Sequence, residues 1–164
     1  MARKFNHAMQ SGFSLTEMVV VLAVLAILMT ITYLSYGSIT ARQGTTQAQT
    51  NAIDLRRVVL SYKSDKGVFP DTISNLMNYS GTSKVSDGLT VVAGQAGTSG
   101  GFTGTLNIST SNGKTSVAYA CYITCTNSTG GRITYWDFIT QARSTDVVYV
   151  GAATSTGTYV VPAP

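Results

Sequence analysis

The sequence has few of the residues on which catalysis and metal binding depend. Its 164 residues include one histidine, His7, and seven acids, of which Glu17 is the sole glutamate. Because His7 lies so close to the start, nothing after it supplies an imidazole base or metal ligand. The aspartates form no Asp-x-Asp-x-Asp-Gly calcium loop, and no Gly-x-x-x-x-Gly-Lys-Ser/Thr phosphate loop occurs. We therefore expect no enzyme activity, no cofactor and no metal site.

Charge is also scarce. Charged residues make up 11 % of the chain, against about 25 % in an average soluble protein. The net charge is +4, and two of the positive charges, Arg3 and Lys4, lie ahead of Gly12. This excess is too small to indicate a nucleic-acid-binding protein by composition.

Only two cysteines occur, Cys121 and Cys125, four positions apart. In one straight strand their Cα atoms would lie about 13 Å apart, whereas a disulfide needs roughly 4.4–6.8 Å. Either the chain bends after Ile123 and the pair forms a disulfide, or both thiols are free. Two cysteines without a histidine are too few ligands for a zinc site.

What the chain does have is one long apolar run with a single acid at its head. No charged residue occurs between Glu17 and Arg42, and the stretch Met18–Leu34 is apolar except for two threonines. About 20 apolar residues span the hydrocarbon core of a bilayer. A helix that is apolar on every side must be surrounded by lipid or protein. A carboxylate within such a helix costs roughly 2.5–3.5 kcal/mol at the bilayer centre, so we interpret Glu17 as functional.

After Thr45 the pattern becomes one-sided. Apolar residues recur at steps of four and three, which predicts a helical stripe: Ala48, Ala52, Leu55, Val59 and Tyr62. We therefore predict one helix from Phe13 to Tyr62, about 75 Å long. Gly67 and Pro70 should end it. Asp71 or Thr72 should cap a short helix that holds Ile73, Leu76 and Met77.

The rest of the chain predicts short strands. Alternation and turn residues place them at Leu89–Val92, Thr105–Ile108, Ser116–Thr124, Ile133–Ile139, Asp146–Val150 and Thr158–Val161. Asn127–Gly131 is turn material, so Ser116–Ile139 should form an antiparallel hairpin. The glycine-rich stretch Ser80–Gly113 is either a surface loop that contacts neighbouring molecules or a slack connector. The expected fold class is α+β, a long helix laid on a small antiparallel sheet.

The residues Gly12-Phe13-Ser14-Leu15-Thr16-Glu17, followed by the apolar run, resemble the N-terminus of type IV pilins and of the pseudopilins of type II secretion. The resemblance implies a pilin-like fold. It also implies that a prepilin peptidase cuts between Gly12 and Phe13 and methylates the new amine of Phe13. The residues implied in filament assembly are Phe13, Glu17, Val20, Leu22, Val24, Leu25 and Leu28.

The same resemblance divides the chain into four parts. Residues 1–12 would be the cleaved leader, 13–36 the transmembrane and filament-core helix, 37–63 its amphipathic continuation, and 64–164 the globular β-domain. The precursor would be a single-pass protein of the cytoplasmic membrane. An assembly platform would then polymerise identical subunits into an extracellular pilus, a filament of the kind used in adhesion and motility.

Other functions stay open from the sequence. Within the same superfamily, the chain fits a type II secretion pseudopilin or a competence pilin. Outside it, the chain fits a membrane-anchored surface protein that never polymerises. An ordinary secretory signal fits less well, because its apolar region is about 7–15 residues and has no acid at its head. Whether a filament would contact DNA or a host surface is not indicated.

Overall fold

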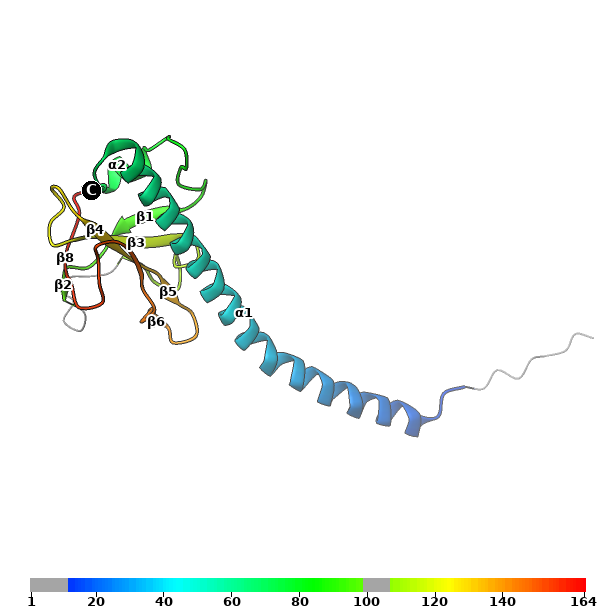
Figure 1. Ribbon diagram of the computed structural model, residues 1–164. Helices are drawn as coiled ribbons and strands as arrows, with labels where there is room; N and C mark the ends of the chain where they lie inside the picture. Colours follow the sequence, from blue (N-terminus) through cyan, green and yellow to red (C-terminus); the bar gives the residue numbers. More distant parts are fainter. Residues whose placement is uncertain (1–11, 99–106) are drawn as a thin grey trace, which may run out of the picture. The chain divides into compact units, whose positions relative to one another are not determined.

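The computed structural model describes residues 12–98 and 107–164, and its fold is α+β as predicted (Figure 1). One long helix is followed by a small, mostly antiparallel sheet. The chain divides into two compact units, Met1–Ile39 and Thr40–Pro164. Apart from Gly12, the predicted leader lies outside the described residues, as does the start of the predicted strand Thr105–Ile108.

Helix α1 runs over Leu15–Lys66, four residues past the predicted end at Tyr62. Gly67 ends it, as predicted. It adopts φ +77°, and its N–H donates to the carbonyl of Lys63 at 2.9 Å. Glycine is favoured there because a Cβ clashes in the left-handed conformation that closes a helix.

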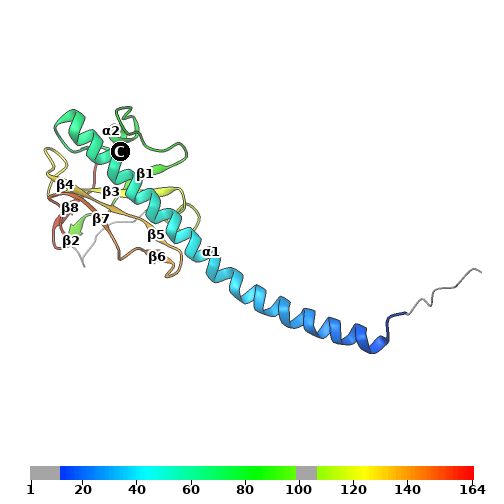
Figure 2. The ribbon, with the colours of Figure 1, turned by 45° about the vertical axis from the view of Figure 1, so that its right-hand side comes forward.

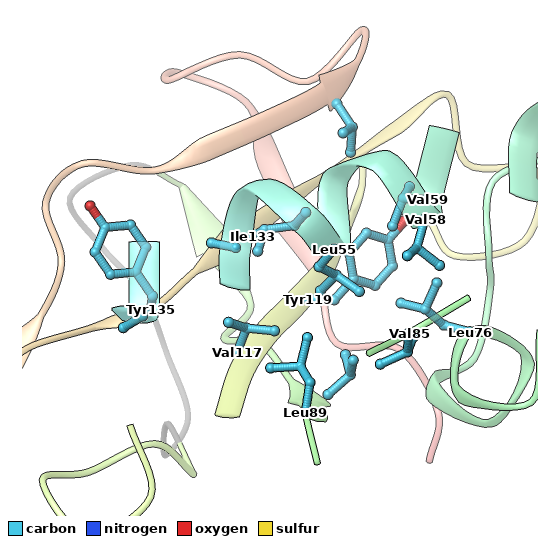
Figure 3. Close-up of a cluster of buried hydrophobic side chains, with 14 of the residues drawn as sticks. Leu55, Val58, Val59, Leu76, Val85, Leu89, Val117, Tyr119, Ile133 and Tyr135 are labelled. Atoms are coloured by element: carbon cyan, nitrogen blue, oxygen red, sulfur yellow. The ribbon is translucent and has the colours of Figure 1, made fainter. Parts of the chain in front are cut away.

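The predicted stripe on α1 is the centre of the hydrophobic core. Ala48, Ala52, Leu55 and Val59 are completely buried, and Tyr62 is half-buried beside them. Figure 3 shows Leu55 and Val59 facing side chains that come from the sheet and from the loops after the helix. The core residues contributed by these other segments include Phe69, Leu76, Val85, Leu89, Val117, Tyr119 and Ile133. The periodicity of the stripe thus identified the buried face of the helix.

A second helix, α2, is short and covers Ile73–Met77. Its N-cap is Thr72, whose side chain accepts a hydrogen bond from the N–H of Asn75 at 3.0 Å. Thr72 is one of the two residues predicted to cap this helix. Leu76 and the preceding Phe69 are both buried against the stripe on α1. Burial of these two side chains fixes the chain where it leaves the long helix.

The sheet is built around strand β3, Ser116–Tyr122 (Figures 1 and 2). Antiparallel to it runs β4, Gly130–Thr134, which pairs in turn with β7, Val148–Gly151. Along its other edge, β3 pairs first with β1, Thr90–Ala93, and then with β8, Thr158–Val160. The remaining strands are β2 (Gly97–Thr98), which pairs with β8, and the separate hairpin of β5 (Trp136–Asp137) and β6 (Ala142–Arg143).

Three strand predictions were wrong in detail. β1 pairs with β3 in parallel, so the sheet is not wholly antiparallel. The predicted strand Ser116–Thr124 ends at Tyr122, and the next residue, Ile123, is exposed. The predicted strand Ile133–Ile139 is divided between β4 and β5. β4 begins earlier, at two glycines assigned to the turn, since Gly130 pairs with Gly151 and Gly131 pairs with Cys121. Glycine fits at position 131 because a Cβ there would overlap the ring of Tyr119.

The β5–β6 hairpin is fastened to α1 at Thr45. The Thr45 hydroxyl donates to Asp137 Oδ1 at 2.8 Å and accepts the N–H of Phe138 at 2.9 Å. Burial raises the pKa of Asp137, but hydrogen bonds from Ile139, Thr45 and Thr140 outweigh that effect and hold the pKa below its ordinary value. These hydrogen bonds therefore stabilise the charged form of Asp137.

Gly44 lies under this hairpin and has a packing role that the sequence did not reveal. A Cβ built on Gly44 lies 2.8 Å from the ring of Phe138, whereas a Cβ on Gly37 meets no atom within 4 Å. Both glycines lie within α1, and neither interrupts it. The helix therefore tolerates Gly37 and requires Gly44.

We expect Gly44→Ala to lower the free energy of unfolding by about 1–3 kcal/mol, because the new methyl group overpacks the Phe138 ring. Gly37→Ala is the matched control. It gains up to about 1 kcal/mol of helix propensity and meets no clash. Thermal unfolding of the full chain in detergent micelles, followed by circular dichroism, measures both variants. Equal melting temperatures for Gly44→Ala and the parent would contradict the packing role.

Candidate functional site

The candidate site begins where α1 begins. Ser14 precedes the first helical residue, and its N–H donates to Glu17 Oε2 at 2.8 Å. This is one arm of a capping box, in which a glutamate in the first turn reaches back to the backbone N–H of the N-cap residue. The other arm is not formed: the Ser14 hydroxyl donates to Thr16 Oγ1 at 3.4 Å and accepts no backbone N–H from the described residues. Sequence reasoning overlooked this cap, although Ser14-Leu15-Thr16-Glu17 carries its signature.

The Glu17 carboxylate is only partly used by the cap. Oε2 accepts the Ser14 N–H, and Oε1 accepts no hydrogen bond from the residues that the structure describes. Over the same residues no basic side chain forms an ion pair with Glu17. The carboxylate is exposed and lies at the positive end of the helix dipole, where a negative charge is favoured. It can accept a further donor without losing the cap.

Gly12 and Phe13 lie in irregular backbone immediately before the helix. Phe13 is 78 % exposed, and a Cβ on Gly12 would meet nothing within 4 Å. The described part of the chain therefore places no steric demand for glycine at position 12. The peptide bond between these two residues is exposed, as a proteolytic site must be.

The predicted assembly residues on α1 are all exposed within the single chain. Val20, Leu22, Val24, Leu25 and Leu28 have exposed fractions between 48 % and 63 %. The two threonines of this segment satisfy their hydroxyls locally, since Thr30 donates to the carbonyl of Ala26 and Thr32 to that of Leu28. By length and composition α1 can cross a membrane. A continuous apolar surface of this kind requires cover from lipid or from other protein.

Far along the sequence, Cys121 and Cys125 form a disulfide, with their Cα atoms 5.0 Å apart. Of the two alternatives that the sequence left open, the structure shows the one in which the chain bends and the disulfide forms. β3 stops at Tyr122, and Ile123 adopts φ +66°, a conformation that costs a β-branched residue of order 1–3 kcal/mol. Ile123 is tied down by its N–H, which donates to the carbonyl of Thr158 at 2.8 Å. The disulfide holds this bend closed at the end of the central strand.

A buried arginine is a further feature that the sequence did not reveal. Arg132 on β4 is 1 % exposed, and its guanidinium lies 4.4 Å from the centre of the Tyr159 ring. Its Nη2 donates to the carbonyl of Gln95 at 2.9 Å. Burial, with a smaller effect of nearby Arg143, lowers the pKa of Arg132 to about 10, so it stays charged at neutral pH. Arg132 thus belongs to the packing of the sheet.

Comparison with known proteins identifies the N-terminal segment. Residues 7–33 match the family model of the prokaryotic N-terminal methylation motif, which is characteristic of the precursors of type IV pilins and pseudopilins. No curated protein and no solved structure matches the chain. The match contains the capped helix start and all but the last residue of the apolar run Met18–Leu34. It does not extend to the second unit.

Reducing the disulfide should destabilise the second unit. Loop-entropy arguments give about 2 kcal/mol for a crosslink that closes so short a loop. We expect reductant to lower the unfolding midpoint of the parent chain. It should leave the midpoint of a Cys121→Ala/Cys125→Ala double variant unchanged. Urea titrations with and without reductant measure this difference, and a parent chain indifferent to reductant would contradict it.

Proposed function

We propose that this chain, which carries the N-terminal methylation motif of pilin-type precursors, is the structural subunit of a type IV pilus or a closely related filament. The precursor is anchored in the cytoplasmic membrane by the apolar part of α1. A prepilin peptidase removes residues 1–12 and methylates the amine of Phe13, and the mature subunits polymerise through their helices. The observation that carries the proposal is the exposed apolar helix headed by one capped carboxylate that forms no ion pair with the described residues.

Cleavage after Gly12 would create a positive charge close to Glu17. The new amine belongs to Phe13, one residue before the Ser14 N–H that Glu17 already accepts. A charged amine and a carboxylate each lose several kcal/mol of hydration when buried alone, and recover much of it only by pairing. Glu17 Oε1 is the acceptor that the cap leaves for this purpose. The amine of an incoming subunit can meet it, and that pairing would set the axial step of the filament.

Assembly would exchange lipid for neighbouring helices around Val20, Leu22, Val24, Leu25 and Leu28. Lipid tails and protein interiors are similarly apolar, so burial alone does not favour the exchange. Packing between helices and the pairing of Glu17 must supply the difference. Glu17 therefore selects the register in which the apolar helices pack.

The alternatives predict different behaviour of the same N-terminus. A type II secretion pseudopilin or a competence pilin would be processed and would assemble, with loss of secretion or DNA uptake on deletion. A non-polymerising surface anchor would stay a single subunit in the membrane. The abundance of this chain in filaments sheared from cells separates a main pilus subunit from all three.

The first expectation concerns processing. Mass spectrometry of the mature protein should give a chain that starts at Phe13 and carries one methyl group on its amine. Gly12→Val should abolish cleavage and leave the precursor in the membrane. A mature chain that starts at Met1, or near Arg42 as after ordinary signal cleavage, would rule out this processing.

The second expectation concerns the charge of Glu17. Glu17→Gln keeps one oxygen that can accept the Ser14 N–H, removes the charge, and replaces the second acceptor oxygen by an NH₂ donor. Cleavage should persist, while filaments made from an all-variant pool should fall at least tenfold, counted by electron microscopy and by immunoblots of sheared filaments.

Ser14→Ala is the matched control, because it removes the N-cap side chain and leaves Glu17 charged. It should keep most of the filaments. Wild-type numbers in Glu17→Gln, or equal loss in both variants, would show that the charge is not the registering contact.

A further inference from the structure

A hollow of about 610 Å³ lies where α1 ends and the chain returns through α2. Its lining includes Tyr62, Asp65 and Lys66 from α1, and Asn78 and Ser80 from the segment after α2. It is separate from the helix start and from the apolar segment. Its volume falls within the range of small-molecule sites, roughly 300–1,000 Å³.

The floor of this hollow is held in place by a hydrogen-bonded tyrosine. Tyr79 is buried, and its hydroxyl donates to Asp65 Oδ2 and lies 3.0 Å from the Ser61 hydroxyl. The rings of Tyr79 and Tyr62 meet edge to face, with centres 5.2 Å apart. A Cβ on Gly81 would overlap the Tyr79 hydroxyl and the Asp65 carboxylate, so the rim closes tightly there. The site is therefore largely formed before any ligand arrives.

Several polar groups at the rim are exposed and uncommitted. The Asn78 amide, the Ser80 hydroxyl, the Lys66 ammonium and Asp65 Oδ1 make no hydrogen bond to the described residues. The set contains both donors and acceptors. Asp65 and Lys66 bring one charge of each sign, and neither forms an ion pair within the described part of the chain. A ligand with a net charge would gain from one of them and lose to the other.

We propose that this hollow binds a neutral saccharide unit of a cell-surface or matrix polysaccharide. A sugar ring offers hydroxyls that both donate and accept, as the rim groups require. Its C–H faces can pack on an aromatic ring, and the Tyr62 ring lines the hollow. The proposal rests on the proposed function only in that a filament subunit would meet such polymers outside the cell. Binding itself needs no filament.

The test uses the full mature chain as single subunits in a zwitterionic detergent, because many common detergents carry sugar headgroups that would compete. Saturation-transfer difference NMR is measured with methyl glycosides of glucose, galactose, mannose and N-acetylglucosamine, and with glucuronic acid. At least one neutral glycoside should give a saturable signal. Glucuronic acid should bind more weakly than that glycoside.

Two variants locate the site. Asn78→Ala should raise the dissociation constant about tenfold through loss of one hydrogen bond, and Tyr62→Leu should do the same through loss of the ring at similar bulk. Gln47→Ala removes an exposed amide elsewhere on α1 and should bind as the parent does. Thermal unfolding of each variant verifies that it is folded.

Four results would overturn the proposal: no neutral glycoside binds at millimolar concentration, the acidic sugar binds best, binding is unchanged in both variants, or purified chain carries a covalent sugar on Asn78. Because the subunits are not assembled, a failure here leaves filament formation untouched. A failure of Glu17→Gln to alter filaments would likewise leave this binding experiment intact.

Discussion

The second unit depends on close packing between one face of α1 and the sheet. Ala48 and Ala52 are buried in the same core as Leu55 and Val59, which lie among Val117, Tyr119 and Ile133. At Gly44 the helix backbone comes close to the ring of Phe138. Once the helix lies there, the hairpin of β5 and β6 and the short helix α2 are positioned by side chains that reach the same face.

The same helix meets a different requirement at its start. Its apolar side chains there are exposed on every side, and the first backbone N–H groups of any helix lack internal partners. Glu17 gives one of these N–H groups a partner by accepting the N–H of Ser14. It thereby combines a local role in starting the helix with a charge that forms no ion pair with the residues that the structure describes. That combination links the local structure of the helix to the proposed assembly.

Sequence patterns predicted the local structure correctly where the environment of a residue is decided by its neighbours in the sequence. The stripe on α1, the stop at Gly67 and the cap at Thr72 follow from helical periodicity and from backbone conformations that nearby residues impose. The site at the helix start was identified for its charge, but its hydrogen bond to Ser14 was not foreseen. The family match independently covers that start, within residues 7–33.

By itself, the sequence determined the long helix, its two kinds of surface, the α+β class and the position of Glu17, because each depends on local spacing and composition. Tertiary structure decided the rest. The parallel pairing of β1 with β3 joins residues distant in sequence, and β4 begins at Gly130 because that residue pairs with Gly151 on β7. The bend that lets Cys121 meet Cys125 requires an isoleucine at positive φ, which no local preference favours. Arg132 can be buried because Gln95 and Tyr159, far from it in sequence, surround its guanidinium.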